Sequence, residues 1–180
     1  HSSWENRHMT KLRRAAIVSP LRTAVGKFQG GLASLEAGEL GAVVLKALVE
    51  RTKIDPEKID DVIFAQGYPS GEAPCVARWS ALAADLPISV PGYQLDRRCG
   101  SGLQSIIDAA MFVQTGAADV VMAGGVESMT NAPFLHMEGR AGHKYGHVEL
   151  KDAIMWDGLW DHVEGWIMGE AAELIAREFE

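Results

Sequence analysis

The regular alternation of short apolar runs with amphipathic stretches constrains the fold of this chain more than any other feature. Three apolar runs have the length of buried strands, at residues 15–18, 62–65 and 120–123, and residues 93–95 are a plausible further strand. Between them, apolar residues recur at helical spacing in segments 40–48, 74–86 and 103–113. Strands that alternate with helices lie mostly parallel in one sheet. The pattern therefore predicts an α/β fold with helices layered on a mostly parallel sheet.

The alternation stops after Pro133, and the remaining residues have a different character. Segment 134–165 is rich in glycine, histidine and tryptophan and shows no clear period. Long irregular stretches in compact domains usually serve a function, so we expect residues 134–180 to form an excursion that covers a site. A helical stripe that includes Met168 and Ile175 then reaches Glu180 without a residue that commonly ends a helix. We expect the sequence to stop within that helix.

These patterns divide the chain into three parts. Residues 1–8, directly before Met9, resemble the remnant of an expression tag and carry no weight in the fold. Residues 9–133 hold the alternating pattern and are expected to form an N-terminal domain that is incomplete by itself. Residues 134–180 are the covering excursion.

Charge and hydropathy exclude several classes of partner. The net charge is -7 and there is no long basic run, so the chain lacks the positive surface that holds nucleic acid. No apolar stretch approaches the ~20 residues of a membrane span, and no segment resembles a secretion signal. The sequence contains 2 cysteines, too few for a disulfide scaffold. We expect a cytoplasmic protein that binds neither nucleic acid nor membrane.

Cys99 is the strongest candidate for chemistry because it lies between a predicted strand and a predicted helix. The small residues Gly100, Ser101 and Gly102 follow it and allow a sharp turn. Unpaired amides and the positive dipole at a helix N-terminus favour a thiolate, and the same amides can stabilise an oxyanion. Most free cysteines are buried and structural. The local context favours a nucleophile here.

A rival interpretation of the same turn is a nucleotide site. The segment beginning Gly100-Ser101-Gly102 and ending at Ser105 nearly fits the dinucleotide fingerprint, with a strand before it. An acidic residue is then expected at the end of the next strand. Asp119 precedes that strand, and Glu127 follows a second glycine pair. A nicotinamide-dependent oxidoreductase thus stays open as an alternative.

The other cysteine and the histidines offer weaker candidates. Cys75 precedes a helical stretch, and we expect it to be structural. His143 and His147 have the spacing of metal ligands on a helix, but nearby glycines disfavour a helix and no third ligand is evident, so no metal site is predicted. His162 is expected to be a solvated or capping residue.

Several short motifs, taken together, resemble the thiolase family. Their order and spacing agree with the family from about Arg14 to the end of the chain, although each motif alone is weak. The motifs are Arg22-Thr23-Ala24 with Gly26, Phe28 and Gly30; Cys99-Gly100-Ser101-Gly102-Leu103-Gln104; Gly124-Gly125-Val126-Glu127-Ser128-Met129 with Ala132-Pro133; Asp157-Gly158-Leu159; and Met168-Gly169 with Ala172-Glu173.

The resemblance implies a layered α/β fold and acyl transfer between coenzyme A thioesters, by cleavage of a 3-ketoacyl-CoA or condensation of two acyl-CoA molecules. It makes Cys99 the catalytic nucleophile and places Leu159 and Met168 where the family contacts coenzyme A. It implies no permanently bound cofactor. It also implies a homo-oligomer, dimeric or tetrameric. A complementary C-terminal half would supply a histidine, a second cysteine and an asparagine loop.

Three positions depart from the family pattern. Asp96 replaces a common asparagine, and its negative charge disfavours a nearby thiolate unless Arg97 or Arg98 offsets it. Ile167 stands where several members have a histidine that contacts coenzyme A, and Leu174 replaces a common asparagine. A second alternative is therefore a non-catalytic thiolase-like module that binds coenzyme A.

Overall fold

The centre of the molecule is a small parallel sheet. In the computed structural model, which describes residues 11–179, the strands β1 (Asp61–Ala65), β2 (Gly92–Leu95) and β3 (Val121–Gly125) pair in the order β2-β1-β3. Both pairings are parallel, with Val62 opposite Gly92 and Met122. The expected tag remnant at residues 1–8 lies outside the described residues.

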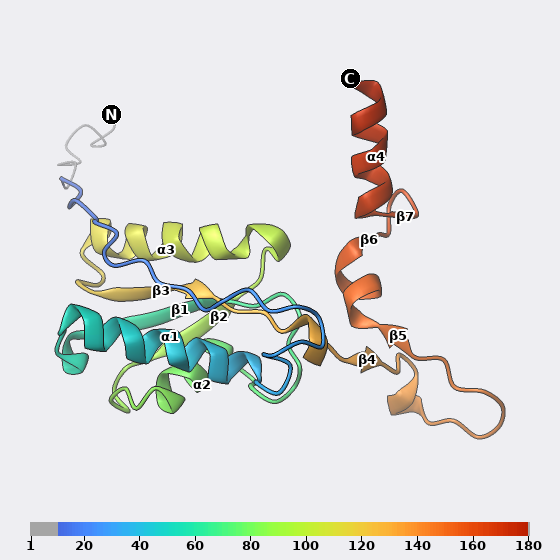
Figure 1. Cartoon of the computed structure of the whole chain (residues 1–180), viewed down its shortest axis with the longest axis horizontal. Coiled ribbons are helices and arrows are strands. Elements are labelled where there is room, and N and C mark those ends of the chain that lie inside the picture. Colours follow the sequence, from blue (N-terminus) through green and yellow to red (C-terminus); the bar gives the residue numbers. More distant parts are fainter. Residues whose placement is uncertain (1–10, 180) are drawn as a thin grey trace, which may run out of the picture.

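Helices cover both faces of this sheet. Helices α1 (Ala37–Thr52) and α2 (Val76–Ala83) pack together on one face, and α3 (Ser101–Thr115) lies on the other (Figure 1). The core between α1, α2 and the sheet contains the fully buried side chains of Leu45, Val62, Val76 and Val90. The structure confirms the predicted layered α/β fold with a mostly parallel sheet.

Local sequence signals explain where the elements begin and end. Asp55 accepts a hydrogen bond from the Glu57 backbone N–H at 3.1 Å and so caps the short 3-10 helix η1 (Pro56–Lys58). Gly116 ends α3 with a φ of 78°, in the left-handed region that glycine adopts readily. Gly125 allows close packing of β3 on β1, because a Cβ there would lie 2.8 Å from the Ala65 Cβ.

The strand predicted at residues 15–18 is wrong. This segment is extended but forms no ladder, and Ile17 is 77% exposed. Hydrogen bonds hold the backbone before and after this segment. The Arg13 N–H donates to the Gln114 carbonyl at 2.9 Å, and the Gln29 N–H donates to Thr130 Oγ1 at 2.9 Å. A strand needs an adjacent backbone edge to pair with, and among residues 11–179 no strand pairs with this segment.

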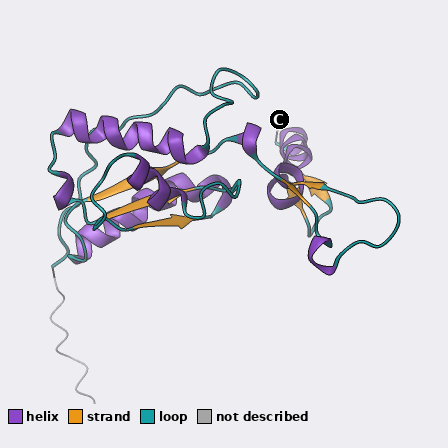
Figure 2. Cartoon of the chain, turned by 90° about the horizontal axis from the view of Figure 1, so that it is seen from below, coloured by secondary structure: helices purple, strands orange, loops and turns teal. Residues whose placement is uncertain are grey.

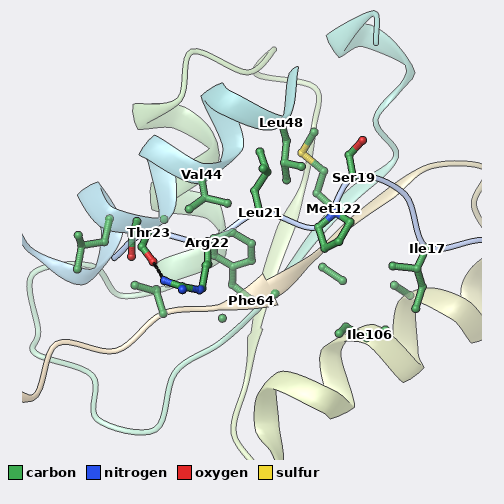
Figure 3. Close-up of a pocket in the computed structure, with 18 of the residues that line it drawn as sticks. Ile17, Ser19, Leu21, Arg22, Thr23, Val44, Leu48, Phe64, Ile106 and Met122 are labelled. Atoms are coloured by element: carbon green, nitrogen blue, oxygen red, sulfur yellow. Dashed lines mark hydrogen bonds between the residues drawn. The ribbon is translucent and has the colours of Figure 1, made fainter. Parts of the chain in front are cut away.

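A cavity of about 1230 Å³ separates the N-terminal segment from the rest of the domain. Figure 3 shows Ile17, Leu21 and Arg22 of that segment around the cavity, with Val44 and Leu48 of α1 and Met122 of β3. The outer edge of β3 faces this space and has no strand partner among residues 11–179. The apolar run therefore lies opposite a sheet edge without joining it.

Residues after Pro133 extend beside the α/β unit rather than on it (Figures 1 and 2). Two short antiparallel hairpins organise them: β4 (Phe134–Leu135) with β5 (Lys151–Asp152), and β6 (Trp160–Asp161) with β7 (Trp166–Ile167). The remaining short turns are η3 (Met129–Asn131), η4 (Gly139–Ala141) and η5 (Met155–Leu159).

The last helix is α4 (Met168–Glu178). The expectation of a helix that continues to Glu180 is wrong in detail, because the Phe179 backbone has left the helical conformation and Glu180 is not described. Within residues 11–179, no helix combines the length and the apolarity needed to cross a membrane.

Candidate active site

Cys99 lies in a tight turn between the sheet and a helix. The 3-10 turn η2 (Arg98–Gly100) follows β2 and leads directly into α3, and the Cys99 side chain is exposed. The hydrogen bonds of the turn run from the Gly100 and Ser101 N–H groups to the carbonyls of Arg97 and Arg98. The Cys99 N–H stays outside this ladder. The turn thus offers a thiol and a backbone donor at the start of a helix.

Ser101 holds the turn in shape. Its hydroxyl accepts a hydrogen bond from the Arg97 N–H at 2.6 Å and donates one to the Arg98 carbonyl at 2.7 Å. Ser101 is only 4% exposed, so these bonds are shielded from water. By contrast, a Cβ at Gly102 would meet nothing within 4 Å, so the space above the helix start is open. A small reacting group therefore has room beside Cys99.

Arg98 offsets the unusual Asp96. Its guanidinium lies 3.0 Å from one Asp96 carboxylate oxygen, and its backbone N–H donates to the other at 2.8 Å. Arg97 points elsewhere and donates to Gln104 on α3. The negative charge at position 96 is thus partly offset within the turn, by an arginine that also bonds Asp157.

Glu127 joins the ends of two strands next to this turn. Its carboxylate accepts hydrogen bonds from the backbone N–H groups of Gly67 at 2.8 Å and Tyr68 at 3.2 Å. The residue as a whole is exposed, but burial of the carboxyl end raises the pKa of Glu127, against the opposing effect of the two amides. Glu127 therefore fixes the loop after β1 to the end of β3.

A smaller cavity, of about 310 Å³, lies among these segments. Residues from the ends of β1 and β3 line it together with the turn and the start of α3, including Gly67, Arg98, Gly102 and Glu127. Gln66 is 3% exposed, and its side-chain Oε1 has no hydrogen-bond partner among residues 11–179. The carboxyl ends of the parallel strands and the start of α3 thus meet beside the Cys99 turn, where open α/β sheets usually bind ligands.

The predicted coenzyme contacts lie in the excursion. Leu159 is the last residue of η5 and is half-buried, whereas Met168 begins α4 and is 42% exposed. Asp157, which precedes Leu159 by two residues, reaches the turn and bonds Arg98 at 2.8 Å. The structure therefore brings the segment of Leu159 to the site, whereas Met168 lies beyond the β6-β7 hairpin.

The weaker candidates are engaged elsewhere. The Cys75 thiol donates to the Gly92 carbonyl at 3.6 Å, as a packed structural cysteine does. His162 lies 2.9 Å from the Trp156 carbonyl, with its ring edge-on to that indole, and His143 lies 3.0 Å from the Gly146 carbonyl. In the part of the chain that the structure describes, no three His, Cys, Asp or Glu residues gather as metal ligands.

Sequence reasoning did not identify the contacts of three site residues, Tyr68, Arg98 and Glu127. Tyr68 and Glu127 join segments 59 residues apart, as do Arg98 and Asp157. The sequence signals were the place of Arg98 beside Cys99 and of Glu127 in the motif after the strand predicted at 120–123, whereas Tyr68 had none. Their partners depend on the parallel pairing of β1 and β3, which a single sequence does not specify.

Cys99 should alkylate faster than Cys75 at neutral pH. Cys99 is exposed at the start of a helix, while Cys75 is partly buried and donates its S–H to a carbonyl. Brief iodoacetamide treatment followed by peptide mass mapping measures both rates in one sample. Preferential labelling of Cys75 would contradict the accessibility and the environment assigned to Cys99.

Comparisons with known proteins agree with this geometry. The family described as "Thiolase, N-terminal domain" matches residues 15–180. The chain is 44% identical over 163 residues to an acetyl-CoA acetyltransferase of Cupriavidus necator, covering 91% of this chain and 42% of the relative. For the fission yeast Schizosaccharomyces pombe acetyl-CoA acetyltransferase the identity is 43% over 162 residues, covering 90% and 41%.

A solved structure shows the same fold. The crystal structure of the Bacillus anthracis acetyl-CoA acetyltransferase superimposes with a TM-score of 0.88 at 35% identity, covering 94% of this chain and 43% of that one. The chain thus spans less than half the length of the relatives that it matches. The chain therefore belongs to the thiolase family and corresponds to its N-terminal domain, because the family match, the sequence identities to the relatives and the shared fold all agree.

Proposed function

We propose that this chain provides the nucleophilic half of a thiolase that transfers acyl groups between coenzyme A thioesters. The observation that carries the proposal is the exposed Cys99 thiol in a turn at the start of α3, next to a backbone N–H that donates to no group among residues 11–179. Relatives over 40% identical are named acetyl-CoA acetyltransferases, which supports an acyl-CoA as the substrate. Family membership favours acyl transfer over the hydride transfer of a nicotinamide enzyme.

The chemistry of the turn fits the first half of such a reaction. The Cys99 thiolate attacks the thioester carbonyl carbon, and the Cys99 N–H donates to the oxygen as it becomes negative. The carbon–sulfur bond to coenzyme A then breaks, and the departing thiolate takes a proton from an acid of the complementary half. An acyl group remains on Cys99.

The second half of the reaction removes that acyl group. In the degradative direction the acyl group comes instead from a 3-ketoacyl-CoA: the Cys99 thiolate attacks the 3-keto carbon, the bond between C2 and C3 breaks, and the C2 carbon takes a proton from the acid and leaves as an acyl-CoA. The thiolate of free coenzyme A then attacks the acyl-Cys99 carbonyl and releases a second, shorter acyl-CoA. In the synthetic direction the α-carbon of a second acyl-CoA, after losing a proton to a base, forms the new carbon–carbon bond. In both directions the Cys99 sulfur leaves as a thiolate and is ready for another cycle.

The remaining parts of the proposal concern binding and assembly. We propose that residues 134–180 cover the site and that Leu159 and Met168 contact coenzyme A. The support is more direct for Leu159, because its segment reaches the Cys99 turn through the bond between Asp157 and Arg98. Residues 9–133 act as the N-terminal domain. The working form is a cytoplasmic homo-oligomer completed by C-terminal halves.

A non-catalytic module that only binds coenzyme A is the second candidate. Its support in the sequence was Asp96, whose charge opposes a thiolate. The pairing of Asp96 with Arg98 weakens that support, because the Arg98 guanidinium, which also bonds Asp157, lies 3.0 Å from the Asp96 carboxylate and partly offsets its charge. Catalysis is therefore the better-supported function.

Incubation of the assembled protein with acetyl-CoA should leave one acetyl group on the peptide that contains Cys99. Intact mass and peptide mapping measure the product, and added NADH should show no change in absorbance or fluorescence on binding. Binding of acetyl-CoA without acetylation would favour the non-catalytic module, and an NADH signal would favour the oxidoreductase.

A further inference from the structure

Arg98 connects more segments than any other side chain described at the site. Its guanidinium donates to the Gly67 carbonyl at 2.6 Å, lies 3.0 Å from Asp96 and bonds Asp157 at 2.8 Å. The three partners come from the loop after β1, from the Cys99 turn and from η5 of the excursion. A single side chain thus connects the nucleophile's turn to the segment that precedes Leu159.

Tyr68 supports the same contact from the neighbouring loop. Its hydroxyl donates to the Ile154 carbonyl at 3.3 Å, and the Arg98 guanidinium carbon lies 6.0 Å from the centre of its ring. A Cβ at Gly158 would overlap the Tyr68 hydroxyl, so any larger residue at that position would have to displace the Tyr68 ring. Residues 154–158 therefore lie directly against Tyr68 and Arg98, and the lack of a side chain at Gly158 allows this close approach.

The backbone of Arg98 is also unusual. Its φ of 47° lies in the left-handed region, which residues other than glycine adopt only at an energetic cost. This conformation immediately precedes Cys99, and the Asp96 carboxylate stabilises it by accepting the Arg98 N–H at 2.8 Å. Non-glycine residues keep such a backbone where the surroundings impose it, commonly at functional sites.

We propose that Arg98 is a positioning residue that fastens residues 154–159 of the excursion to the Cys99 turn through Asp157. Its consequence for catalysis rests on the proposed function: by holding Asp157, Arg98 places Leu159 beside the nucleophile and so shapes the acyl-CoA site. The planar guanidinium suits this role because it can donate to two carboxylates and a carbonyl at once, whereas a lysine ammonium acts as a point charge.

Four variants separate this role from general damage. Asp157→Asn removes the charge on the excursion and leaves the turn intact. Arg98→Asn removes the guanidinium but keeps a residue that tolerates the left-handed backbone. Arg98→Lys keeps the positive charge but lacks the planar guanidinium and its several N–H donors. Arg97→Gln is the matched control, because Arg97 is the adjacent arginine and bonds Gln104 rather than the excursion.

Hydrogen exchange of the assembled protein measures the contact without any reference to activity. We expect amides in residues 154–160 to exchange about three- to tenfold faster in Asp157→Asn and Arg98→Asn, the scale set by a partly exposed ion pair with added hydrogen bonds. Arg98→Lys should fall between these variants and the unmodified protein. Arg97→Gln should leave this segment unchanged.

Kinetics in the same protein test the consequence for catalysis. For Asp157→Asn the KM for acetyl-CoA should rise by about fivefold or more, while kcat and the rate of Cys99 alkylation stay within about twofold. The double variant Arg98→Asn/Asp157→Asn should exchange no faster than Arg98→Asn alone, because both changes break one contact.

Unchanged exchange in Asp157→Asn, or additive effects in the double variant, would overturn the proposal. Altered exchange with an unchanged KM would also overturn it, since the contact would then be structural only. If the unmodified protein is never acylated, the function proposed above fails by itself, and the exchange results still decide whether Arg98 holds the excursion.

Discussion

Cys99→Ser should abolish acyl transfer in the assembled protein. The hydroxyl of serine does not ionise at neutral pH, and the helix start and backbone donor of the turn do not replace the base that would have to activate it. We expect acetylation at position 99 to disappear and thiolysis of acetoacetyl-CoA to fall by about 10⁴-fold or more, the scale on which loss of the nucleophile acts in other covalent enzymes.

Cys75→Ser is the matched control for this experiment. It makes the same chemical change at a cysteine that is partly buried and bonded to the Gly92 carbonyl, away from the turn. A serine hydroxyl can keep a hydrogen bond at that position, so activity should stay within about threefold and stability within about 1 kcal/mol. The two variants therefore differ in position and not in chemistry.

The measurement combines intact mass after acetyl-CoA treatment with an assay of thiolysis. Acetylation that persists in Cys99→Ser would rule out Cys99 as the acyl acceptor. Loss of activity in Cys75→Ser with a normally folded protein would move the chemistry to the other thiol. A folded Cys99→Ser protein that binds acetyl-CoA without transfer is the expected result.

The sequence was sufficient for most of the α/β unit because the signals there are local. The apolar period of residues 40–48 predicts α1, and the residues that cap η1 and end α3, Asp55 and Gly116, are of types that commonly do so. Each of these signals depends on residues within one or two helical turns. The alternation of strands and helices then determines the layered architecture.

The N-terminal segment shows where local signals fail. Residues 15–18 have the composition of a strand, but a strand exists only when a neighbouring edge pairs with it. In the structure the cavity lies between this segment and β3, so the apolar run stays extended and largely exposed. The outcome depends on what occupies that space, which no pattern within the run can specify.

The candidate site divides in the same way. Cys99 could be singled out because its small neighbours and its place between strand and helix are visible in a few consecutive residues. The partner of Asp96 could not, since Arg97 and Arg98 are equally close in sequence and differ only in their directions. The contact between Arg98 and Asp157 joins residues 59 apart, and only the folded chain reveals it.

The chain by itself should be poorly soluble and inactive, and the complementary half should restore both properties together. The open edge of β3 along the cavity and the exposed apolar side chains around it invite association with other chains. Ile17 and Val25 of the N-terminal segment are 77% and 90% exposed, and Leu103 on α3 is 67% exposed. A strand and helices from another half would cover such surfaces.

Activity should depend on the same assembly. A positioned acid or base contributes about 10²- to 10⁴-fold to a proton transfer, and by family resemblance these groups belong to the C-terminal half. The test compares thiolysis of acetoacetyl-CoA by residues 9–180 alone, by the other half alone and by the two combined, together with the soluble fraction of each. We expect turnover only in the combined sample. Robust turnover by residues 9–180 alone would show that the required groups already lie within the chain, and His162, which now bonds the Trp156 carbonyl, would be the first residue to substitute.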